Sequence, residues 1–435
     1  MGRLPYQSGK SGYVTKYVSR NQALKKLQLC LADFRRLCIL KGVYPRVPEK
    51  VPSKNSKTTW YHVNDIKFLA HDPIVETLRA VATHEKKVAK KFGRRETELG
   101  DALLERMPQY NLDHLVKERY PSFEACLRDI DDCISTIHLY ASLQTDKVLN
   151  VPNEVILNCQ RLAREWDYAV ARLGAIKKAF ISIKGTYLQA NMHNIDITWV
   201  IPHKFTPVLP EKVDYRVMST FLEFYQCQLG FALYQIYSEM GESYPPNLNV
   251  DADSNGLWLG ALPPFNVEKG LFSGLKMAIG RESKYEWLDL VLRASGANVT
   301  EEGDSGITHI VTDRPISRKL PKIIYVQPQY IADCLNNTHI LRPEEYSPGK
   351  QLPDHLSPFV DNVKEGYLPD RQLELDAQLG KETEEVEQDI IDDEFLEAQE
   401  TMLNKKSRWL YERAKLTEEG NKKRAELLES RKVKK

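Results

Sequence analysis

Residues 15–45 read TKYVSRNQALKKLQLCLADFRRLCILKGVYP, and this stretch decides how the first part of the chain folds. Its apolar residues recur mostly at intervals of three or four, the spacing that places side chains on one face of a helix. Ser19 followed by Gln22 fits a capping box, and Gly42 followed by Pro45 is a typical stop signal. The stretch therefore predicts a helix between Ser19 and Gly42 that buries one apolar stripe: Leu24, Leu27, Leu31, Phe34, Leu37 and Cys38.

The same stretch is strongly basic. Residues 1–60 contain thirteen Lys or Arg against two Asp or Glu, although the net charge of the whole chain is only +1. A solvated helix face is the usual explanation of basic residues, but acidic neighbours that would form ion pairs along the helix are almost absent here. We therefore interpret this face as a phosphate-binding surface for RNA, with these candidate contact residues: Arg20, Lys25, Lys26, Arg35, Arg36 and Lys41.

Composition limits the class of protein. A chain of 435 residues that is 42% hydrophobic can bury a sizeable core and is expected to form two or more domains. It has no uncharged apolar run of membrane-spanning length, and its first ten residues lack the apolar region of a secretory signal. The seven cysteines lie in apolar stretches without a C-x-x-C pair, as expected of buried thiols in a reducing compartment. We expect a soluble intracellular protein that does not contact a membrane.

The chain reads as a multi-domain protein. Residues 1–250 are expected to form a mainly α-helical N-terminal domain, with a small β element made of two strands at 179–189 and 195–201. Residues 251–269 are expected to be a linker. Strands and helices alternate over residues 270–358, which predicts an α/β domain with a parallel sheet.

The last part of the chain, residues 359–435, has a different character. Residues 361–400 contain fifteen Asp or Glu against three Lys or Arg, whereas 401–435 contain twelve basic residues against five acidic ones. Such blocks bury too little apolar surface to order by packing alone. We expect a charged tail, acidic and then basic, that is helical or disordered.

The sequence contains no recognisable catalytic, cofactor-binding or metal-binding motif. It lacks a Walker lysine loop, a G-x-G-x-x-G turn after a strand, H-E-x-x-H and G-x-S-x-G, and no histidine has the spacing of a metal ligand. Adjacent acidic pairs at 131–132 and 392–393 do not face a common point on a helix. We therefore expect no catalytic residue, no cofactor, no metal and no enzymatic activity. Catalytic groups assembled only by the fold, as in a hydrolase or transferase with a cryptic site, stay open at this point.

Small and aromatic residues mark the turns and the last helix of the α/β segment. Gly274 precedes the first strand, Gly296 stands at the small-residue turn after the first helix, and Thr308 opens the third strand. The last helix carries Tyr330 and Cys334 four residues apart. In this arrangement the segment resembles a BRCT domain, a family that has a Trp-x-x-x-Cys pattern in its last helix. The resemblance implies that most of these positions are structural, and the expected core positions are Gly274, Trp287, Gly296, Thr308, Tyr330 and Cys334.

Some BRCT domains bind phosphopeptides, and this chain departs from their pattern. The family's pocket uses a Ser or Thr at the end of the first strand, where this chain has Ile279. Arg318 or Lys319 is left to meet an anion, but the segment around them is short and bounded by prolines. We therefore expect docking on protein or rRNA rather than phosphopeptide binding.

Eight longer stretches are distinctive: RNQALKKLQLCLADFRRLCILKGVYPR (20–46), YHVNDIKFLAHDPI (61–74), ERYPSFEACLRDIDD (118–132), SIKGTYLQA (182–190), TWVIPHKF (198–205), DYRVMSTFLEFY (214–225), YVQPQYIADCLN (325–336) and YSPGKQLPDHLSPFV (346–360). In these stretches the chain resembles the Pescadillo family of nucleolar ribosome-assembly factors, and the resemblance spans residues 2 to about 365.

This resemblance implies a non-enzymatic scaffold of the nucleolus and nucleoplasm. The protein would join two WD-repeat proteins in a PeBoW-type complex on pre-60S particles, beside other assembly factors and precursor rRNA of the large subunit. It would be required for removal of internal transcribed spacer 2 and for maturation of 5.8S and 25S/28S rRNA. The alternative is a BRCT adaptor that phosphoproteins recruit to chromatin during replication or the DNA damage response.

Overall fold

The computed structural model describes residues 16–48, 58–143, 151–203, 215–254, 256–265, 267, 270–283, 285–301, 303–314, 320–360, 370–378 and 413. The chain divides into two compact units, residues 1–360 and 361–435. In the second unit the described residues include one helix, α14 (Asp370–Gln378). The predictions for the rest of the charged tail, and those for Arg318 and Lys319, lie outside the described residues.

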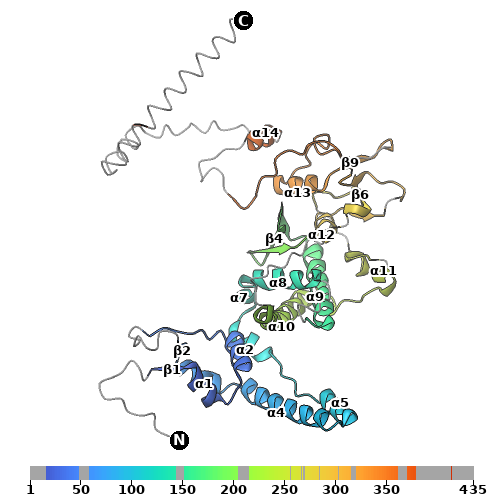
Figure 1. The fold of residues 1–435 in the computed structure, drawn as a ribbon. Coiled ribbons are helices and arrows are strands. Elements are labelled where there is room, and N and C mark those ends of the chain that lie inside the picture. Colours follow the sequence, from blue (N-terminus) through green and yellow to red (C-terminus); the bar gives the residue numbers. More distant parts are fainter. Residues whose placement is uncertain are drawn as a thin grey trace. The chain divides into compact units, whose positions relative to one another are not determined.

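The first part of unit 1 is mainly helical, as predicted (Figure 1). Its elements are β1 (Tyr17–Ser19), α1 (Arg20–Leu27), α2 (Leu31–Lys41), β2 (Trp60–His62), α3 (Val63–Ala70), α4 (Pro73–Gly93), α5 (Thr97–Glu105) and α6 (Asp113–Arg119). The apolar faces of these helices meet in a core around Phe34, Leu37 and Ile66, whose side chains are fully buried.

The predicted helix over residues 20–41 is two helices, and the single continuous helix was wrong. Gln28 adopts a left-handed conformation with φ of 55°, which ends α1. The Sγ atom of Cys30 then accepts a hydrogen bond from the amide of Asp33 at 3.3 Å and opens α2. Because this break resets the helical phase, Leu31 of the predicted stripe is 37% exposed.

Both predicted ends of this segment are confirmed. The amide of Ser19 donates to Oε1 of Gln22 at 3.2 Å, which is one half of a capping box. Gly42 ends α2 with φ of 66°, a conformation that glycine adopts without a steric penalty. Just before α1, Val18 pairs antiparallel with Tyr61, so the chain enters the helix from a short β ribbon that the sequence analysis did not predict.

The next part of unit 1 contains a three-stranded antiparallel sheet of β3 (Ile176–Ser182), β4 (Gly185–Met192) and β5 (Ile195–Ile201), in which β4 is central. Its helices are α7 (Phe123–Arg128), α8 (Asp131–Ser142), α9 (Asn153–Leu173) and α10 (Tyr215–Met240). The sequence analysis expected two strands here. The stretch 179–189 contains a tight turn at Ile183, which is 98% exposed, and therefore contributes to two strands rather than one.

The α/β region forms a four-stranded parallel sheet with strand order β7-β6-β8-β9, which confirms the predicted fold class. Its elements are β6 (Lys276–Ile279), α12 (Glu286–Ala294), β7 (Asn298–Thr300), β8 (His309–Val311), β9 (Ile324–Val326) and α13 (Pro328–Asn337). One 3-10 turn, Arg281–Ser283, follows β6, and the chain that leads into this region contains the short helix α11 (Val250–Ser254) and a second 3-10 turn, Leu259–Ala261.

The expected core positions of the α/β region fall into two groups. Trp287, Tyr330 and Cys334 are buried, with exposed fractions of 4%, 1% and 0%. The remaining three act through the backbone or a hydrogen bond, and one of them differs from the expectation. Gly274 is exposed with φ of 82°, so it serves a turn and not the core. Thr308 is half-buried, and its hydroxyl donates to the Lys276 carbonyl at 2.8 Å.

Gly296 is required by a close approach of the backbone. A Cβ atom at this position would lie 2.8 Å from the carbonyl oxygen of Val267, and φ is 81°. The chain leading into the α/β region crosses the turn here, because Gly270 lies on the same side of Gly296.

Residues 251–269 were expected to be a linker, and several of them pack against the helical part. The indole of Trp258 donates to Oδ2 of Asp167 on α9 at 2.8 Å, and Leu259 is buried. Asp167 is fully buried, and burial raises the pKa of its carboxyl group well above the usual value. The nearby imidazole of His138 is buried too, which lowers its pKa to about 3 and keeps the ring neutral.

Candidate nucleic-acid interface

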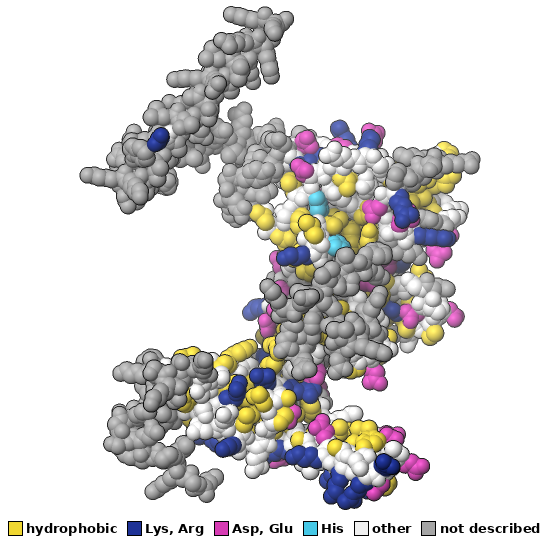
Figure 2. All heavy atoms as spheres, viewed as in Figure 1, with side chains coloured by type: hydrophobic (Ala, Val, Ile, Leu, Met, Phe, Trp, Pro, Cys, Tyr) yellow, Lys and Arg dark blue, Asp and Glu magenta, His cyan; other side chains and the backbone are white. Residues whose placement is uncertain are grey.

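Three of the six predicted RNA-contact residues are exposed on α1 and α2: Lys25, Lys26 and Arg35. None of the three forms an ion pair with another described residue. Figure 2 shows Lys and Arg side chains in dark blue on this part of the surface. Because their charges are not neutralised by neighbours, these side chains can exchange counterions for phosphate groups. We call these three residues the α1–α2 surface.

Two arginines from other helices fix the ends of α1 and α2. Arg79 donates through Nε and Nη2 to the carbonyl of Leu27, at 2.9 and 2.7 Å. Arg119 donates through Nη2 to the carbonyl of Leu40 at 2.9 Å. Carbonyls in the last turn of a helix have no partner inside the helix, so these bonds orient both helices and the cations on them. Neither arginine was predicted from the sequence. Arg79 lies 52 positions from Leu27 and Arg119 lies 79 positions from Leu40, and no local pattern links residues so far apart.

The Arg36 side chain is 36% exposed but is paired within the fold and does not stand free on the surface, which corrects the sequence interpretation. Its guanidinium pairs with the carboxylate of Glu223 on α10, with Nε 3.2 Å from Oε2. Its Cζ atom lies 5.1 Å from the centre of the Tyr110 ring, and the hydroxyl of Tyr110 donates to the same carboxylate. A side chain held by two partners contributes to packing between α2 and α10 rather than to a free phosphate site.

Lys41 is the second correction. Its side chain is only 6% exposed, and Nζ lies 2.7 Å from Oδ2 of Asp72 and 2.6 Å from Oε2 of Glu118. Burial alone raises the pKa of Asp72, but the hydrogen bonds from Lys41 and from the amide of Ile74 outweigh this effect and lower it below its usual value. Lys41 therefore neutralises a buried carboxylate, and its charge does not face solvent.

Arg20 is less exposed than the three cations of the α1–α2 surface. It is half-buried at the start of α1, where its amide donates to the carbonyl of Thr59 at 3.0 Å. Burial raises the pKa of the neighbouring Tyr61, and the positive charges of Arg20 and Arg35 limit the rise, so both guanidiniums lie near that ring. Arg20 therefore borders the α1–α2 surface.

The carboxyl end of the parallel sheet is a poor phosphate site among the described residues. The amide of Gly280, which follows β6, already donates to the carbonyl of Val311 at 2.8 Å. Ser283 is fully buried and accepts a hydrogen bond from the amide of Asp313. Burial raises the pKa of Asp313, and the nearby carboxylate of Glu282 raises it further. The two carboxylates disfavour a phosphate group, whereas the exposed Arg281 and Arg314 beside them favour one, so the argument against a phosphate pocket rests on the occupied Gly280 amide and Ser283 hydroxyl.

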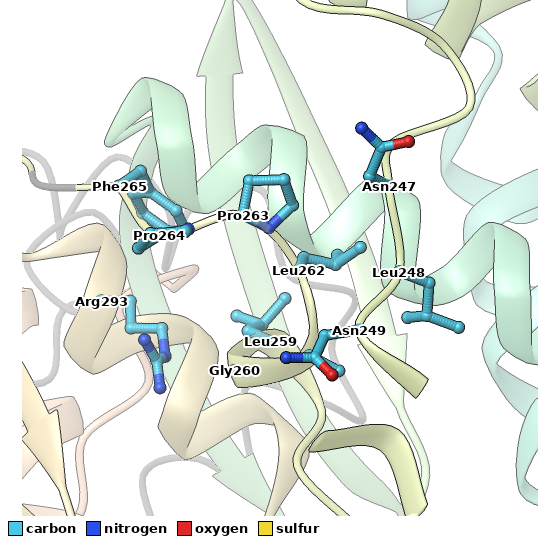
Figure 3. A pocket seen from close by; sticks show the side chains of 11 residues that line it. Asn247, Leu248, Asn249, Leu259, Gly260, Leu262, Pro263, Pro264, Phe265 and Arg293 are labelled. Carbon is cyan, nitrogen blue, oxygen red and sulfur yellow. The ribbon is translucent and has the colours of Figure 1, made fainter. Parts of the chain in front are cut away.

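A groove of about 520 Å³ lies between the chain before α11 and the chain after it (Figure 3). Asn247 and Leu248 line one side, and Pro263 and Phe265 line the other. The charged residue in the lining is Arg293, whose Nε donates to Asp289 at 2.6 Å. The described lining offers no pair of titratable groups that could transfer a proton, so this groove gives no catalytic constellation.

Two further searches of the described residues give no site. They contain no group of three or more His, Cys, Asp or Glu side chains arranged to hold a metal ion. No helix among them is both long and apolar enough to span a membrane.

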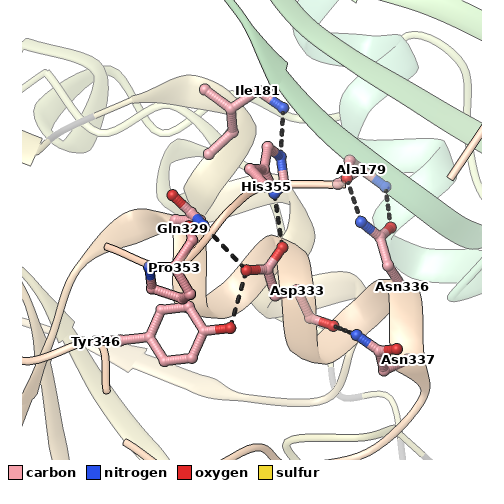
Figure 4. Close-up of polar contacts among 9 residues, drawn as sticks. All are labelled: Ala179, Ile181, Gln329, Asp333, Asn336, Asn337, Tyr346, Pro353 and His355. Atoms are coloured by element: carbon pink, nitrogen blue, oxygen red, sulfur yellow. Dashed lines mark hydrogen bonds and ion pairs between the residues drawn. The ribbon is translucent and has the colours of Figure 1, made fainter. Parts of the chain in front are cut away.

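One Asp–His pair has the arrangement of a catalytic dyad, and its partners give it a structural role (Figure 4). Nδ1 of His355 lies 2.6 Å from Oδ1 of Asp333 on α13. The other ring nitrogen accepts a hydrogen bond from the amide of Ile181 on β3 at 3.0 Å. The second oxygen of Asp333 accepts hydrogen bonds from Tyr346 at 2.9 Å and from Gln329 at 3.2 Å. Both ring nitrogens of His355 are hydrogen-bonded within the protein, so neither is free to accept a proton from a substrate.

These contacts protect the outer edge of the three-stranded sheet. Asn336 on α13 accepts from the amide of Ala179 at 2.9 Å and donates to its carbonyl at 2.8 Å (Figure 4). On the opposite edge, Asp131 and Ser135 of α8 accept from amides of β5. Free strand edges pair readily with other chains, and here side chains satisfy them instead. The sheet thus joins the helical part to the α/β region.

Replacing Asn336 by alanine is expected to destabilise the protein by about 1–3 kcal/mol, because a backbone amide and a carbonyl of β3 lose their partner. The matched control is Asn337→Ala, since the Asn337 side chain bonds only within α13, to the carbonyl of Asp333. Urea denaturation followed by circular dichroism measures both. Equal stability of the two variants would contradict the role of Asn336 at the sheet edge.

Fold and surface together define a class of protein: a helical domain joined through a small antiparallel sheet to a parallel α/β region, with an exposed basic surface on α1 and α2. The family described as Pescadillo N-terminus matches residues 7–265. This chain belongs to the Pescadillo family, as the sequence analysis predicted.

Relatives from distant organisms support the same assignment along most of the chain. The Pescadillo homolog of Oryza sativa subsp. japonica is 38% identical over 84% of this chain and 73% of its own length. The Arabidopsis thaliana homolog is also 38% identical, over 84% of this chain and 74% of its own. The Nematostella vectensis homolog is 35% identical over 98% of this chain and 96% of its own. The attribution of residues 270–358 to the BRCT family stays a prediction.

Proposed function

We propose that this protein is a non-enzymatic scaffold factor of large (60S) ribosomal subunit assembly, required for removal of internal transcribed spacer 2 and for maturation of 5.8S and 25S/28S rRNA. Membership of the Pescadillo family supports this proposal. The observation that carries it is the α1–α2 surface, where Lys25, Lys26 and Arg35 stand exposed and without ion-pair partners among the described residues. These cations lie in the segment that matches the Pescadillo N-terminus.

The mechanism would be placement rather than cleavage. Three cations on two short helices bind phosphate groups without reading base identity, so they fix where the precursor rRNA lies. Arg79 and Arg119 hold those helices by their last carbonyls, which keeps the cations in a constant arrangement. The rRNA is then presented in register to nucleases that belong to other proteins.

The same proposal includes partners and a location. The protein would act within a PeBoW-type complex with two WD-repeat proteins, beside other pre-60S assembly factors, in the nucleolus and nucleoplasm. The α/β region would dock on protein. The described carboxyl end of its sheet presents the acidic Glu282 and Asp313 beside the basic Arg281 and Arg314, a mixed surface rather than a purely basic phosphate site.

Reversing the three charges of the α1–α2 surface tests the proposal. The variant Lys25→Glu/Lys26→Glu/Arg35→Glu is expected to lower crosslinking to precursor rRNA in growing cells about tenfold or more, which corresponds to at least about 1.4 kcal/mol. The readout is sequencing of RNA crosslinked to the tagged protein. The fold should persist, because the three side chains are exposed.

The matched control reverses three exposed lysines elsewhere, Lys177, Lys184 and Lys276, with the same change in net charge. This control is expected to keep its rRNA crosslinks. If both variants crosslink like the unaltered protein while circular dichroism shows them folded, the α1–α2 surface does not bind rRNA. Enrichment on chromatin after DNA damage, with rRNA crosslinks at background, would favour the adaptor instead.

A further inference from the structure

The distal half of α4 and α5 form a helical arm, residues 84–105. In its first half α4 buries Ile74, Val75 and Leu78, but beyond these it buries only Val88 among its described residues. In α5, Gly100 is the one residue classed as buried. The arm therefore takes little part in the protein core, and its surfaces face outward.

The arm nevertheless has defined internal contacts. The ring of Phe92 packs so closely on α5 that a Cβ atom at Gly100 would lie 2.8 Å from it. The imidazole Nε2 of His84 lies 2.7 Å from the carbonyl oxygen of Leu103, and Lys91 pairs with Glu96 at the turn. These contacts hold α5 against α4. The exposed side chains of the arm therefore keep fixed positions relative to one another.

The outer side of the arm carries a second basic cluster, which the α1–α2 surface does not include (Figure 2). Its members are exposed and form no ion pair with described residues: Lys86, Lys87, Lys90, Arg94 and Arg95. Lys86 and Lys90 are four residues apart and therefore share one face of α4. The three lysines span about 6 Å along α4, at 1.5 Å per residue, and Arg94 and Arg95 follow directly after the helix end at Gly93.

A helix dipole alone does not account for this cluster. Cations are favoured within the last turn of a helix, where carbonyl groups carry partial negative charge. That effect covers Lys90 and Arg94 at the end of α4. Lys86 and Lys87 lie about two turns before the end, at Gly93, where the dipole has little influence. Their charges are thus left for an external anion.

The position of the cluster relates it to the α1–α2 surface. Arg79 of α4 binds the last carbonyl of α1 at Leu27, and Lys86 lies seven residues further along α4. Seven residues correspond to about 10 Å along the helix axis. The basic cluster of the arm therefore continues outward from the end of α1, where Lys25 and Lys26 stand.

We propose that the arm is a second RNA-binding surface, which grips the sugar-phosphate backbone of an RNA helix independently of its sequence. The inference rests on the proposed function and adds to it a second, separate point of contact. Two contacts on one RNA fix its direction as well as its position, which a single patch of cations does not.

Charge density favours an RNA helix over an acidic protein segment. A nucleic-acid duplex carries one negative charge per about 1.7 Å of its axis, whereas an extended peptide has at most one per about 3.3 Å. Phe92 packs on Gly100 and is 38% exposed, so the case for a backbone contact rests on the cations and not on this ring. On α5, the exposed Glu98, Asp101 and Glu105 repel a polyanion and limit the contact to the α4 side.

The test is the salt dependence of binding to a fluorescently labelled RNA hairpin of about 20 base pairs, with the full-length protein. Lys86→Gln/Lys90→Gln is compared with Lys177→Gln/Lys184→Gln, which removes two exposed charges from the β3–β4 hairpin. Gln and Lys have similar helix propensities, so α4 should persist. The arm variant is expected to reduce the slope of log K against log salt by about 1.4–1.8, since each phosphate contact contributes about 0.7–0.9. The control should leave the slope unchanged.

Several results would overturn the inference. If the unaltered protein binds the hairpin and crosslinks to rRNA in cells, but the arm variant has the same slope as the control, the arm is not an RNA contact and the proposed function stands. If the unaltered protein does not crosslink to rRNA at all, the proposed function fails first. A synthetic peptide of residues 361–400 serves as the competing probe. If only the affinity for this peptide depends on Lys86 and Lys90, the arm binds an acidic protein segment and the proposal is wrong.

Discussion

Replacing Trp287 by alanine is expected to lower the free energy of unfolding by about 3–5 kcal/mol. Trp287 lies on α12 and is 4% exposed, and its ring stacks on Tyr285 with the ring centres 6.4 Å apart. Removing the indole leaves a cavity that the surrounding helices and strands fill only in part, so the loss exceeds the transfer free energy of the side chain. Because α12 also packs against α9, the damage should reach the helical part of unit 1.

The measurement is urea denaturation of the full-length protein, followed by far-ultraviolet circular dichroism. The matched control is Leu320→Ala, which truncates a large apolar residue of the same region that is 54% exposed. A change within about 0.5 kcal/mol is expected for this control. If Trp287→Ala denatures at the same urea concentration as the unaltered protein, Trp287 does not lie in the core and the placement of α12 is wrong.

Replacing Lys41 by methionine is expected to cost about 3–5 kcal/mol at neutral pH, because the carboxylate of Asp72 stays buried without its main partner. The Asp72 side chain is 2% exposed, and it also accepts a hydrogen bond from the amide of Ile74 at the start of α4. The double variant Lys41→Met/Asp72→Asn removes both charges and keeps a good N-cap residue, so it should recover part of the loss. Lys26→Ala, at an exposed position of α1, is the control.

The loss caused by Lys41→Met should depend on pH in a defined direction. In the folded protein the pKa of Asp72 lies below its usual value. Its ion pair therefore contributes stability above the unfolded pKa, about 3.9, and loses that contribution as pH falls through the lower folded pKa. Without Lys41, burial raises the pKa of Asp72, so the variant takes up the proton first. The difference between Lys41→Met and the unaltered protein should therefore shrink as pH falls from that raised pKa to the lowered pKa of the unaltered protein. A difference that stays constant between neutral and acid pH would show that the Asp72 charge is not involved. RNA binding per folded molecule should not change.

Local signals in the sequence predicted the ends of elements better than their continuity. Ser19, Gln22 and Gly42 act on neighbouring backbone groups, so their roles are visible in the sequence. The fold class of the α/β region was predictable too, because short strand-like and helix-like stretches alternate along its sequence. The left-handed residue Gln28 interrupts a helix without Gly or Pro, and no sequence rule marks it. The short ribbon between Val18 and Tyr61 joins distant residues and was missed for that reason.

The candidate site was only partly predictable. The sequence shows which residues are charged, but it does not show which of them form ion pairs in the fold. Lys25, Lys26 and Arg35 are exposed, as the spacing of the apolar stripe predicted. Arg36 has the same spacing, yet Glu223 lies 187 positions away in the sequence and pairs with it in the fold. Lys41 is also predicted as surface, but its partner Asp72 belongs to another helix. Long-range ion pairs thus remove cations from the surface without leaving a local signal.

We propose that this protein sits on precursors of the large ribosomal subunit, and ultraviolet crosslinking in growing cells tests this placement most directly. The tagged protein is purified under denaturing conditions, and both the bound RNA and the crosslinked peptides are identified. Our account predicts RNA reads concentrated near 5.8S, 25S/28S and internal transcribed spacer 2, with crosslinked peptides from α1 and α2. RNA at background level, with the protein instead enriched on chromatin after DNA damage, would contradict it.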